Sequence, residues 1–103
     1  MPSRLEQLRK LAEATPDDPL AHYAVGLEYF NLEQWDDARA AFEKALTVDS
    51  AYTAAYYHKA RAEIRARQRD AARDTLAAGI TCAHANGDMK TEREMRELLE
   101  TIQ

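Results

Sequence analysis

Residues 21–46 read AHYAVGLEYFNLEQWDDARAAFEKAL, and residues 55–80 read AYYHKARAEIRARQRDAARDTLAAGI. The two stretches lie 34 residues apart, and their small and bulky apolar positions coincide. The matched pairs are Ala21 and Ala55, Tyr23 and Tyr57, Gly26 and Ala60, Ala38 and Ala72, and Phe42 and Leu76. A fixed period of this length is typical of stacked supersecondary units. Such stacks usually present a surface to a partner.

The composition favours one helical domain. Only three Gly and three Pro occur among 103 residues, which is typical of helices joined by short turns. The single Cys82 cannot form an internal disulfide. No apolar run approaches the roughly 18 residues of a membrane span, and the N-terminus lacks the apolar core of a signal peptide. We therefore expect a cytoplasmic protein that does not bind membranes.

The charge distribution disfavours nucleic acid as a partner. The net charge is −4, and acidic residues flank the basic stretch 59–73 on both sides. Residues 17–50 hold eight acids and two bases, whereas residues 51–86 hold six bases and three acids. This asymmetry has two interpretations, a solvated surface with complementary halves or a basic patch that meets acidic partners.

The spacing of apolar residues and helix-start signals predicts six helices. They are expected from Ser3 to Pro16, from Pro19 to Asn31, from Trp35 to the break at Asp49, from Tyr52 to Arg67, from Arg69 to Ala83 and from Met89 to Ile102. Each helix is too short to be stable alone, so packing between them must stabilise the fold.

The first repeat unit has a spaced pattern of small and bulky residues, His22-x2-Val25-Gly26-x2-Tyr29, then Ala38-x3-Phe42, then Ala45. This pattern resembles that of the tetratricopeptide repeat family, W-x2-L-G-x2-Y, A-x3-F and P over 34 residues. Trp35 stands where that family usually has an aromatic residue, and Ser50 replaces the closing proline. The resemblance implies an all-α fold, a right-handed superhelical stack of antiparallel helix hairpins.

The second unit follows the same pattern less closely. Lys59 and Glu63 stand where the family has apolar residues, so we expect this helix to dock less firmly. The resemblance divides the chain into a half repeat (1–18), two full repeats (19–52 and 53–86) and a capping helix (87–103). The far side of the last helix is polar, which suits a cap and favours a complete chain.

The resemblance also implies a binding surface. In tetratricopeptide arrays the first helix of each hairpin lines a concave groove that often holds a peptide. The matching positions here are Leu20, Tyr23, Leu27, Phe30 and Asn31, then Ala54, Tyr57, Arg61, Ile64 and Arg65, and finally Glu92, Arg96 and Leu99.

Two features of this set suggest what the groove binds. Tyr23 and Tyr57 are one repeat apart, so we expect their rings side by side along the groove. Arg61 and Arg65 are four residues apart and share one helix face. With Arg96 nearby, they suit a carboxylate or phosphate held in a forked geometry.

A structural interpretation of the same residues stays open. The tyrosines would then cover apolar surface, and the arginines would pair with Glu63, Glu92 or Glu94. One known version of the groove does not fit this chain. Related domains that grip the acidic tails of heat-shock chaperones use Lys, Asn and Arg at positions where this sequence has Tyr23, Leu27, His58, Asp88 and Glu92.

We expect a non-catalytic module that binds a protein or peptide with micromolar affinity, about −8 kcal/mol. The sequence has no nucleophile–base pair and no glycine-rich phosphate loop, and Cys82-x-His84 offers too few ligands for a metal. No cofactor is therefore expected. The alternative function is that of a self-associating scaffold, a homodimer formed through an apolar patch of the last helix made of Met89, Met95, Leu99 and Ile102.

Overall fold

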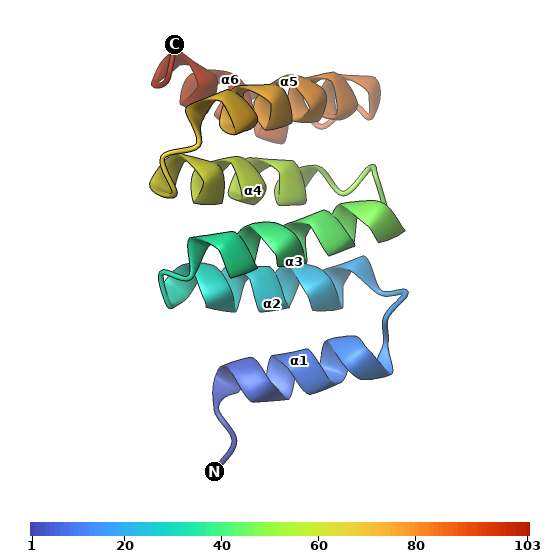
Figure 1. Cartoon of the computed structure of the whole chain (residues 1–103). Coiled ribbons are helices and arrows are strands. Elements are labelled where there is room, and N and C mark those ends of the chain that lie inside the picture. Colours follow the sequence, from blue (N-terminus) through green and yellow to red (C-terminus); the bar gives the residue numbers. More distant parts are fainter.

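The computed structural model describes all residues from 1 to 103 and contains six α-helices and no strand. They are α1 (Arg4–Ala14), α2 (Pro19–Asn31), α3 (Trp35–Val48), α4 (Thr53–Arg65), α5 (Arg69–Ala85) and α6 (Met89–Glu100). Figure 1 shows them stacked in chain order, with α1 and α6 at opposite ends. The predicted all-α fold with six helices is confirmed.

The helices pack as a row of antiparallel hairpins. Helix α2 pairs with α3 and α4 pairs with α5, while α4 also contacts α2 and α3. Helix α6 contacts both α4 and α5, and α1 contacts only α2. The molecule is accordingly elongated, with principal extents of 43 × 28 × 18 Å. No helix combines the length and the apolar character that a membrane crossing requires.

Small residues let the helices of each hairpin approach closely. A Cβ atom added to Gly26 would lie 2.5 Å from the ring of Phe42, which is itself fully buried. A Cβ atom added to Gly79 would lie 2.6 Å from both Met95 and Tyr56. Larger side chains at either position would overpack the core. The repeat of small beside bulky residues therefore corresponds to real contacts between helices.

The last helix differs from one of our expectations. Met95 is completely buried and Ile102 is 4% exposed, because both belong to the core cluster shared by α4, α5 and α6. Leu99 is half-buried, and only Met89 is largely exposed. The apolar patch that we predicted for a homodimer is therefore wrong. The strongly amphipathic α6 has used its apolar side to cover the end of the stack.

The turns inside the two full hairpins share an uncommon backbone conformation. Glu33 has a φ of 59° and Arg67 a φ of 63°, and the two residues are one repeat apart. In each turn the next amide donates to a carbonyl five residues back, from Gln34 to Tyr29 at 2.9 Å and from Gln68 to Glu63 at 2.8 Å. This geometry ends helices and usually uses glycine.

Replacing Arg67 with glycine should stabilise the protein. A residue with a Cβ atom is strained at positive φ by about 1–2 kcal/mol, and the greater freedom of glycine in the unfolded chain offsets part of the gain. We expect Arg67→Gly to raise the free energy of unfolding by about 0.5–1 kcal/mol in urea titrations followed by circular dichroism. Arg67→Ala keeps the Cβ atom and should give no such gain. Equal effects of the two substitutions would contradict this interpretation.

Candidate functional site

The site is built on α2, α4 and the first residue of α3, around the ring of Phe30. The guanidinium carbon of Arg61 lies 4.7 Å from the centre of this ring, and that of Arg65 lies 5.8 Å from it. Arg61 also lies 5.9 Å from the Tyr57 ring, and Arg65 lies 5.4 Å from the Trp35 ring. Cation–π contacts of this kind are favourable and hold both side chains in place. We call these five residues the arginine–aromatic cluster.

The two arginines of the cluster have no acidic partner. Six other basic side chains form ion pairs within the chain: those of Arg4, Arg39, Lys59, Arg73, His84 and Arg96. The recorded polar contact of Arg61 is with Nδ1 of His58, at 3.4 Å. Stacking on a ring uses the face of a guanidinium and leaves its N–H edge for an anion. The cluster therefore presents two ordered cations that nothing in the fold neutralises.

His58 joins the cluster to the core. Its ring lies 5.2 Å from that of Tyr57, 5.6 Å from that of Tyr23 and 5.9 Å from that of Phe42. Tyr23 and Tyr57, which we expected side by side, thus both contact one histidine. His58 is not among the predicted groove residues, although its position three residues before Arg61 places both on one helix face.

Burial changes the proton affinity of the rings beside the cluster. Burial and the neighbouring Arg61 together lower the pKa of His58 to about 4, so this imidazole is neutral at pH 7. Burial and the nearby Tyr52 raise the pKa of Tyr23, whose hydroxyl therefore stays protonated. The positive charge of the site at neutral pH thus comes from Arg61 and Arg65 alone.

The remaining predicted residues have different surroundings. Leu27 and Ile64 are half-buried and pack against the core, while Leu20 and Asn31 are exposed. Arg96 donates to Glu92 of its own helix at 3.0 Å, and this hydrogen bond lowers the pKa of Glu92. The structural interpretation therefore applies to Arg96, but not to Arg61 and Arg65.

Acidification should destabilise the protein through His58. A histidine whose pKa is about 4 when folded and 6.5 when unfolded contributes full stability above pH 6.5, and this stability is lost as the pH falls toward 4. We expect a loss of about 2 kcal/mol, since the partly exposed ring reduces the full effect of the shift. Urea unfolding between these pH values should show this loss. In His58→Gln the loss of unfolding free energy between pH 6.5 and pH 4 should be smaller by about 2 kcal/mol. Equal losses in the variant and the wild type would contradict the assignment.

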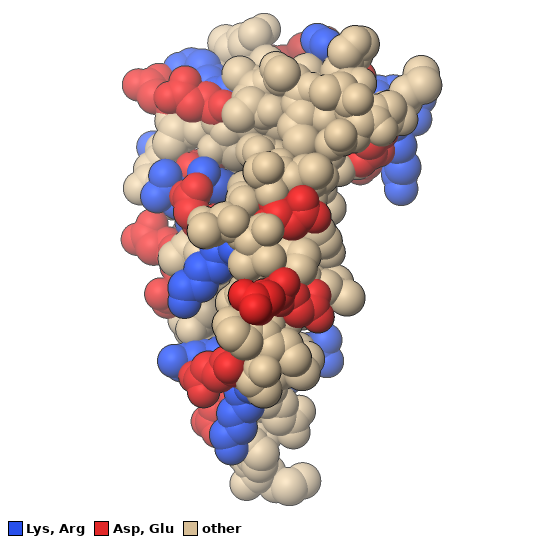
Figure 2. Space-filling model, turned by 90° about the vertical axis from the view of Figure 1, so that its right-hand side faces the viewer, with Lys and Arg blue, Asp and Glu red and all other residues tan.

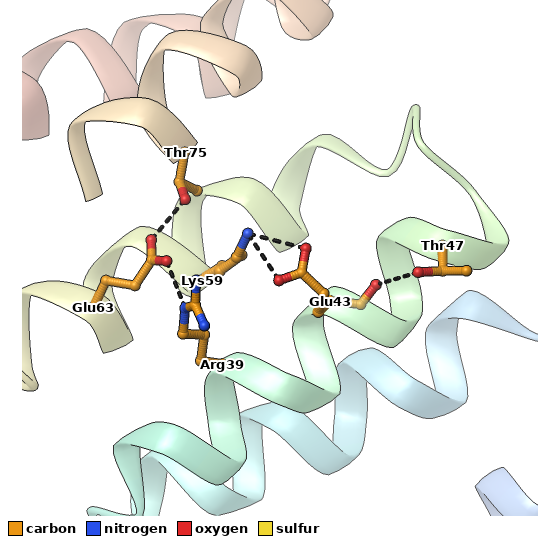
Figure 3. Close-up of polar contacts among 6 residues, drawn as sticks. All are labelled: Arg39, Glu43, Thr47, Lys59, Glu63 and Thr75. Carbon is orange, nitrogen blue, oxygen red and sulfur yellow. Dashed lines mark hydrogen bonds and ion pairs between the residues drawn. The ribbon is translucent and has the colours of Figure 1, made fainter. Parts of the chain in front are cut away.

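A second polar group, shown in Figure 3, joins α3, α4 and α5. Nε of Arg39 donates to Glu63 at 2.7 Å, and the hydroxyl of Thr75 donates to the other oxygen of this carboxylate at 2.6 Å. Nζ of Lys59 contacts the carboxylate of Glu43 at 3.1 Å. We call these five residues the polar ladder. The hydrogen bond between Arg39 and Glu63 raises the pKa of Arg39.

The polar ladder shows how α4 accommodates the two charged residues at its apolar positions. Glu63 is completely buried and the side chain of Lys59 is only 12% exposed, yet both find partners on α3. Neither charge is therefore buried without a partner, and the expectation that α4 docks less firmly than α2 stays a prediction. The signal in the sequence is that Arg39 and Glu43 on one helix match Glu63 and Lys59 on the next, four residues apart in both cases and in antiparallel order.

Replacing Arg39 alone should destabilise the protein more than replacing Arg39, Glu63 and Thr75 together. Arg39→Met leaves the Glu63 carboxylate buried with only Thr75 as a partner, at a cost of about 3 kcal/mol. The triple variant Arg39→Met, Glu63→Met and Thr75→Val buries no charge and should regain most of this loss. Chemical denaturation of both variants measures the difference. A triple variant less stable than Arg39→Met would show that the pair itself is strongly stabilising.

The histidines, cysteine and acids form no metal centre. No group of three or more such side chains is placed to hold a metal ion. Cys82 contacts the carbonyl of Ser50 at 3.3 Å, whereas His84 contacts Glu92 at 3.2 Å.

Comparison with known proteins agrees with this architecture. The sequence family described as Tetratricopeptide repeat matches residues 30–91, which is more than half of the chain. A tetratricopeptide repeat domain protein from Salinibacter ruber is 31% identical, with a TM-score of 0.78 over 85% of this chain and 89% of the other. The stacked helix hairpins thus define a helical repeat protein. The chain belongs to the tetratricopeptide repeat family.

Two further solved structures share the fold. A protein from Bordetella parapertussis is 24% identical, with a TM-score of 0.85 over 99% of this chain and 89% of the other. The TPR2B domain of yeast Sti1, solved as a complex with pHsp70, is 23% identical, with a TM-score of 0.88 over 93% of this chain and 77% of the other. Comparison with curated protein sequences gives no match.

Proposed function

We propose that this protein is a non-catalytic interaction module that binds an acidic segment of another protein on the face formed by α2 and α4. The observation that carries the proposal is the pair of unneutralised guanidinium groups, Arg61 and Arg65, held on the Phe30 ring at 4.7 and 5.8 Å. The pHsp70 complex of the yeast Sti1 domain supports peptide binding by this fold. The cytoplasmic location remains a prediction.

The chemistry of the cluster favours carboxylates. Each guanidinium can form two parallel hydrogen bonds with one carboxylate, and such bonds are about twice as strong as neutral ones. Both cations lie against one ring, so two acidic side chains close together in an extended segment can reach both. The half-buried Tyr57 and Ile64 supply apolar surface beside the charges for aliphatic side chains of the same segment.

A titration with a defined peptide tests the proposal. The probe is acetyl-Gly-Asp-Glu-Leu-Asp-Glu-Leu-Gly-amide, and the control peptide has lysine at its four acidic positions. We expect the acidic peptide to shift the amide resonances of Tyr23, Tyr57 and Arg61, with a Kd in the micromolar range or weaker, about −8 kcal/mol at most. The lysine peptide should leave these resonances in place. The proposal is wrong if all three stay still with the acidic peptide.

The variant pair makes the test specific. Arg61→Ala with Arg65→Ala should weaken binding about tenfold or more, because two charge-assisted contacts are lost. Arg93→Ala, at an exposed position of α6, removes a charge outside the cluster and should leave the affinity unchanged. Similar losses in both proteins would indicate general electrostatic attraction.

A further inference from the structure

The two cations of the arginine–aromatic cluster select an acidic partner but do not distinguish one acidic segment from another. Acidic and basic side chains are mixed along one side of the molecule, so charge at longer range adds little selectivity (Figure 2). Finer selection depends on donors of fixed position, because a partner that leaves such a donor without an acceptor binds less well. A donor of this kind lies beside the cluster, on His58.

The contact between His58 and Arg61 determines which ring nitrogen of the histidine carries the proton. Nη1 of Arg61 lies 3.4 Å from Nδ1 of His58, on the next turn of the same helix. A guanidinium has N–H donors and no acceptor, so Nδ1 must accept and therefore carries no proton. Because burial and the charge of Arg61 lower the pKa of His58 to about 4, the ring holds one proton at pH 7. That proton lies on Nε2.

The Nε2–H group of His58 has no partner within the chain. The ring makes one hydrogen bond, and it makes it through Nδ1. Every buried side-chain nitrogen or oxygen of the protein has a hydrogen-bond partner. Since Nε2 has none, it is accessible to solvent, although the ring as a whole is half-buried. The fold thus leaves one N–H donor open for an acceptor of a ligand.

Three aromatic rings hold this donor in place. The imidazole is stacked on Phe42 at 5.9 Å, with 28° between the planes, and it meets Tyr23 and Tyr57 edge to face at 5.6 and 5.2 Å. The two tyrosines belong to α2 and α4, the helices that form the face of the cluster. A donor held by packing loses little freedom when a ligand binds, so its hydrogen bond contributes to affinity more fully.

We propose that His58 is a specificity-determining residue of this site, which positions Arg61 through Nδ1 and donates from Nε2 to an uncharged oxygen of the bound segment. This role rests on the proposed binding of an acidic segment. The carboxylates of the segment go to Arg61 and Arg65, because hydrogen bonds with a charged donor are about twice as strong. A backbone carbonyl or a side-chain amide oxygen beside the carboxylates is left for the neutral imidazole.

Two substitutions of His58 separate this role from that of a packing residue. In His58→Gln the side-chain amide keeps an oxygen that accepts from Arg61 and an N–H group that donates to the ligand, but the stacked ring is lost. In His58→Phe the ring remains, and both the acceptor and the donor are lost. The proposed role therefore gives the two variants one order for affinity, and packing gives them the opposite order for stability.

Titration with acetyl-Gly-Asp-Glu-Leu-Asp-Glu-Leu-Gly-amide at pH 7 measures the affinities, and urea unfolding measures the stabilities. We expect His58→Gln to bind within about twofold of the wild type and His58→Phe to bind about tenfold more weakly, since its donor and the acceptor for Arg61 are both lost. His58→Phe should be at least as stable as the wild type, because its buried ring has no polar group to desolvate. His58→Gln should be less stable.

The position of the proton is measured directly. Long-range ¹H–¹⁵N spectra of the imidazole show which nitrogen is protonated, and this readout needs no ligand. We expect the proton on Nε2 in the free protein, and we expect the Nε2 resonance to shift when the acidic peptide binds. The peptide with lysine at the four acidic positions should leave this resonance in place. The exposed His84 is the internal control, whose resonances should change with neither peptide.

Two results overturn the role of His58 and leave the proposed function intact. A proton on Nδ1 in the free protein is incompatible with the hydrogen bond from Arg61. A His58→Phe protein that binds the acidic peptide as tightly as the wild type or as His58→Gln shows that the ring serves only for packing. A wild type that does not bind the acidic peptide is a different result, because it contradicts the proposed function and the role of His58 together.

Discussion

The fold depends on the contact between the Phe42 ring and the backbone of α2 at Gly26. No Cβ atom fits there, because it would lie 2.5 Å from the ring. The same ring lies 5.7 Å from Tyr23 and 5.9 Å from His58, which belong to the surface of α2 and α4. The distance between α2 and α3 therefore sets the positions of the Tyr23 and His58 rings. These rings lie against α4, which carries Arg61 and Arg65. A core contact of this kind transmits position through packed side chains, which deform little.

The two repeats solve the same packing problem with different chemistry. The pair Val25 and Tyr29 gives α2 an apolar side, while Lys59 and Glu63 at the same positions give α4 a charged one. The charged solution works because Glu63 finds two donors, Arg39 and Thr75, at hydrogen-bond distances. A buried carboxylate without them would cost several kcal/mol. Such pairing adds little net stability, but it favours one register of α3 against α4 over others.

The sequence predicted the helices and their order because both follow from local signals. The side chain of Ser3 accepts a hydrogen bond from the Glu6 amide, as the capping sequence indicated, and α2 begins at Pro19 after the acidic residues that precede it. The partner of Glu63 was not predicted, since Arg39 lies 24 residues away and only the register of two helices brings them together. The burial of Met95, which we had predicted in a surface patch, was missed for a similar reason. Its burial depends on Gly79, which leaves room for its sulfur.

For the predicted site residues, too, the sequence predicts the shared helix face but not the contacts with other helices. The common helix face of Arg61 and Arg65 follows from their spacing, but their stacking on Phe30 needs the distance between α2 and α4. The place of His58 depends on Phe42, a residue of the neighbouring helix. Periodicity along one helix predicts which residues share a face, and only packing between helices decides which of them touch.

Aromatic rings rather than acids hold the two arginines of the cluster, and this has a consequence for binding. An acidic partner within the chain would order a guanidinium equally well, but a ligand would then have to displace it. A ring orders the cation through its face and leaves both the charge and the N–H donors for a ligand. Arg96 illustrates the other case, because Glu92 already occupies its donors. Arg61 and Arg65 therefore keep their charge available where α2 and α4 meet, at Phe30, whereas the charge of Arg96 on α6 is neutralised by Glu92.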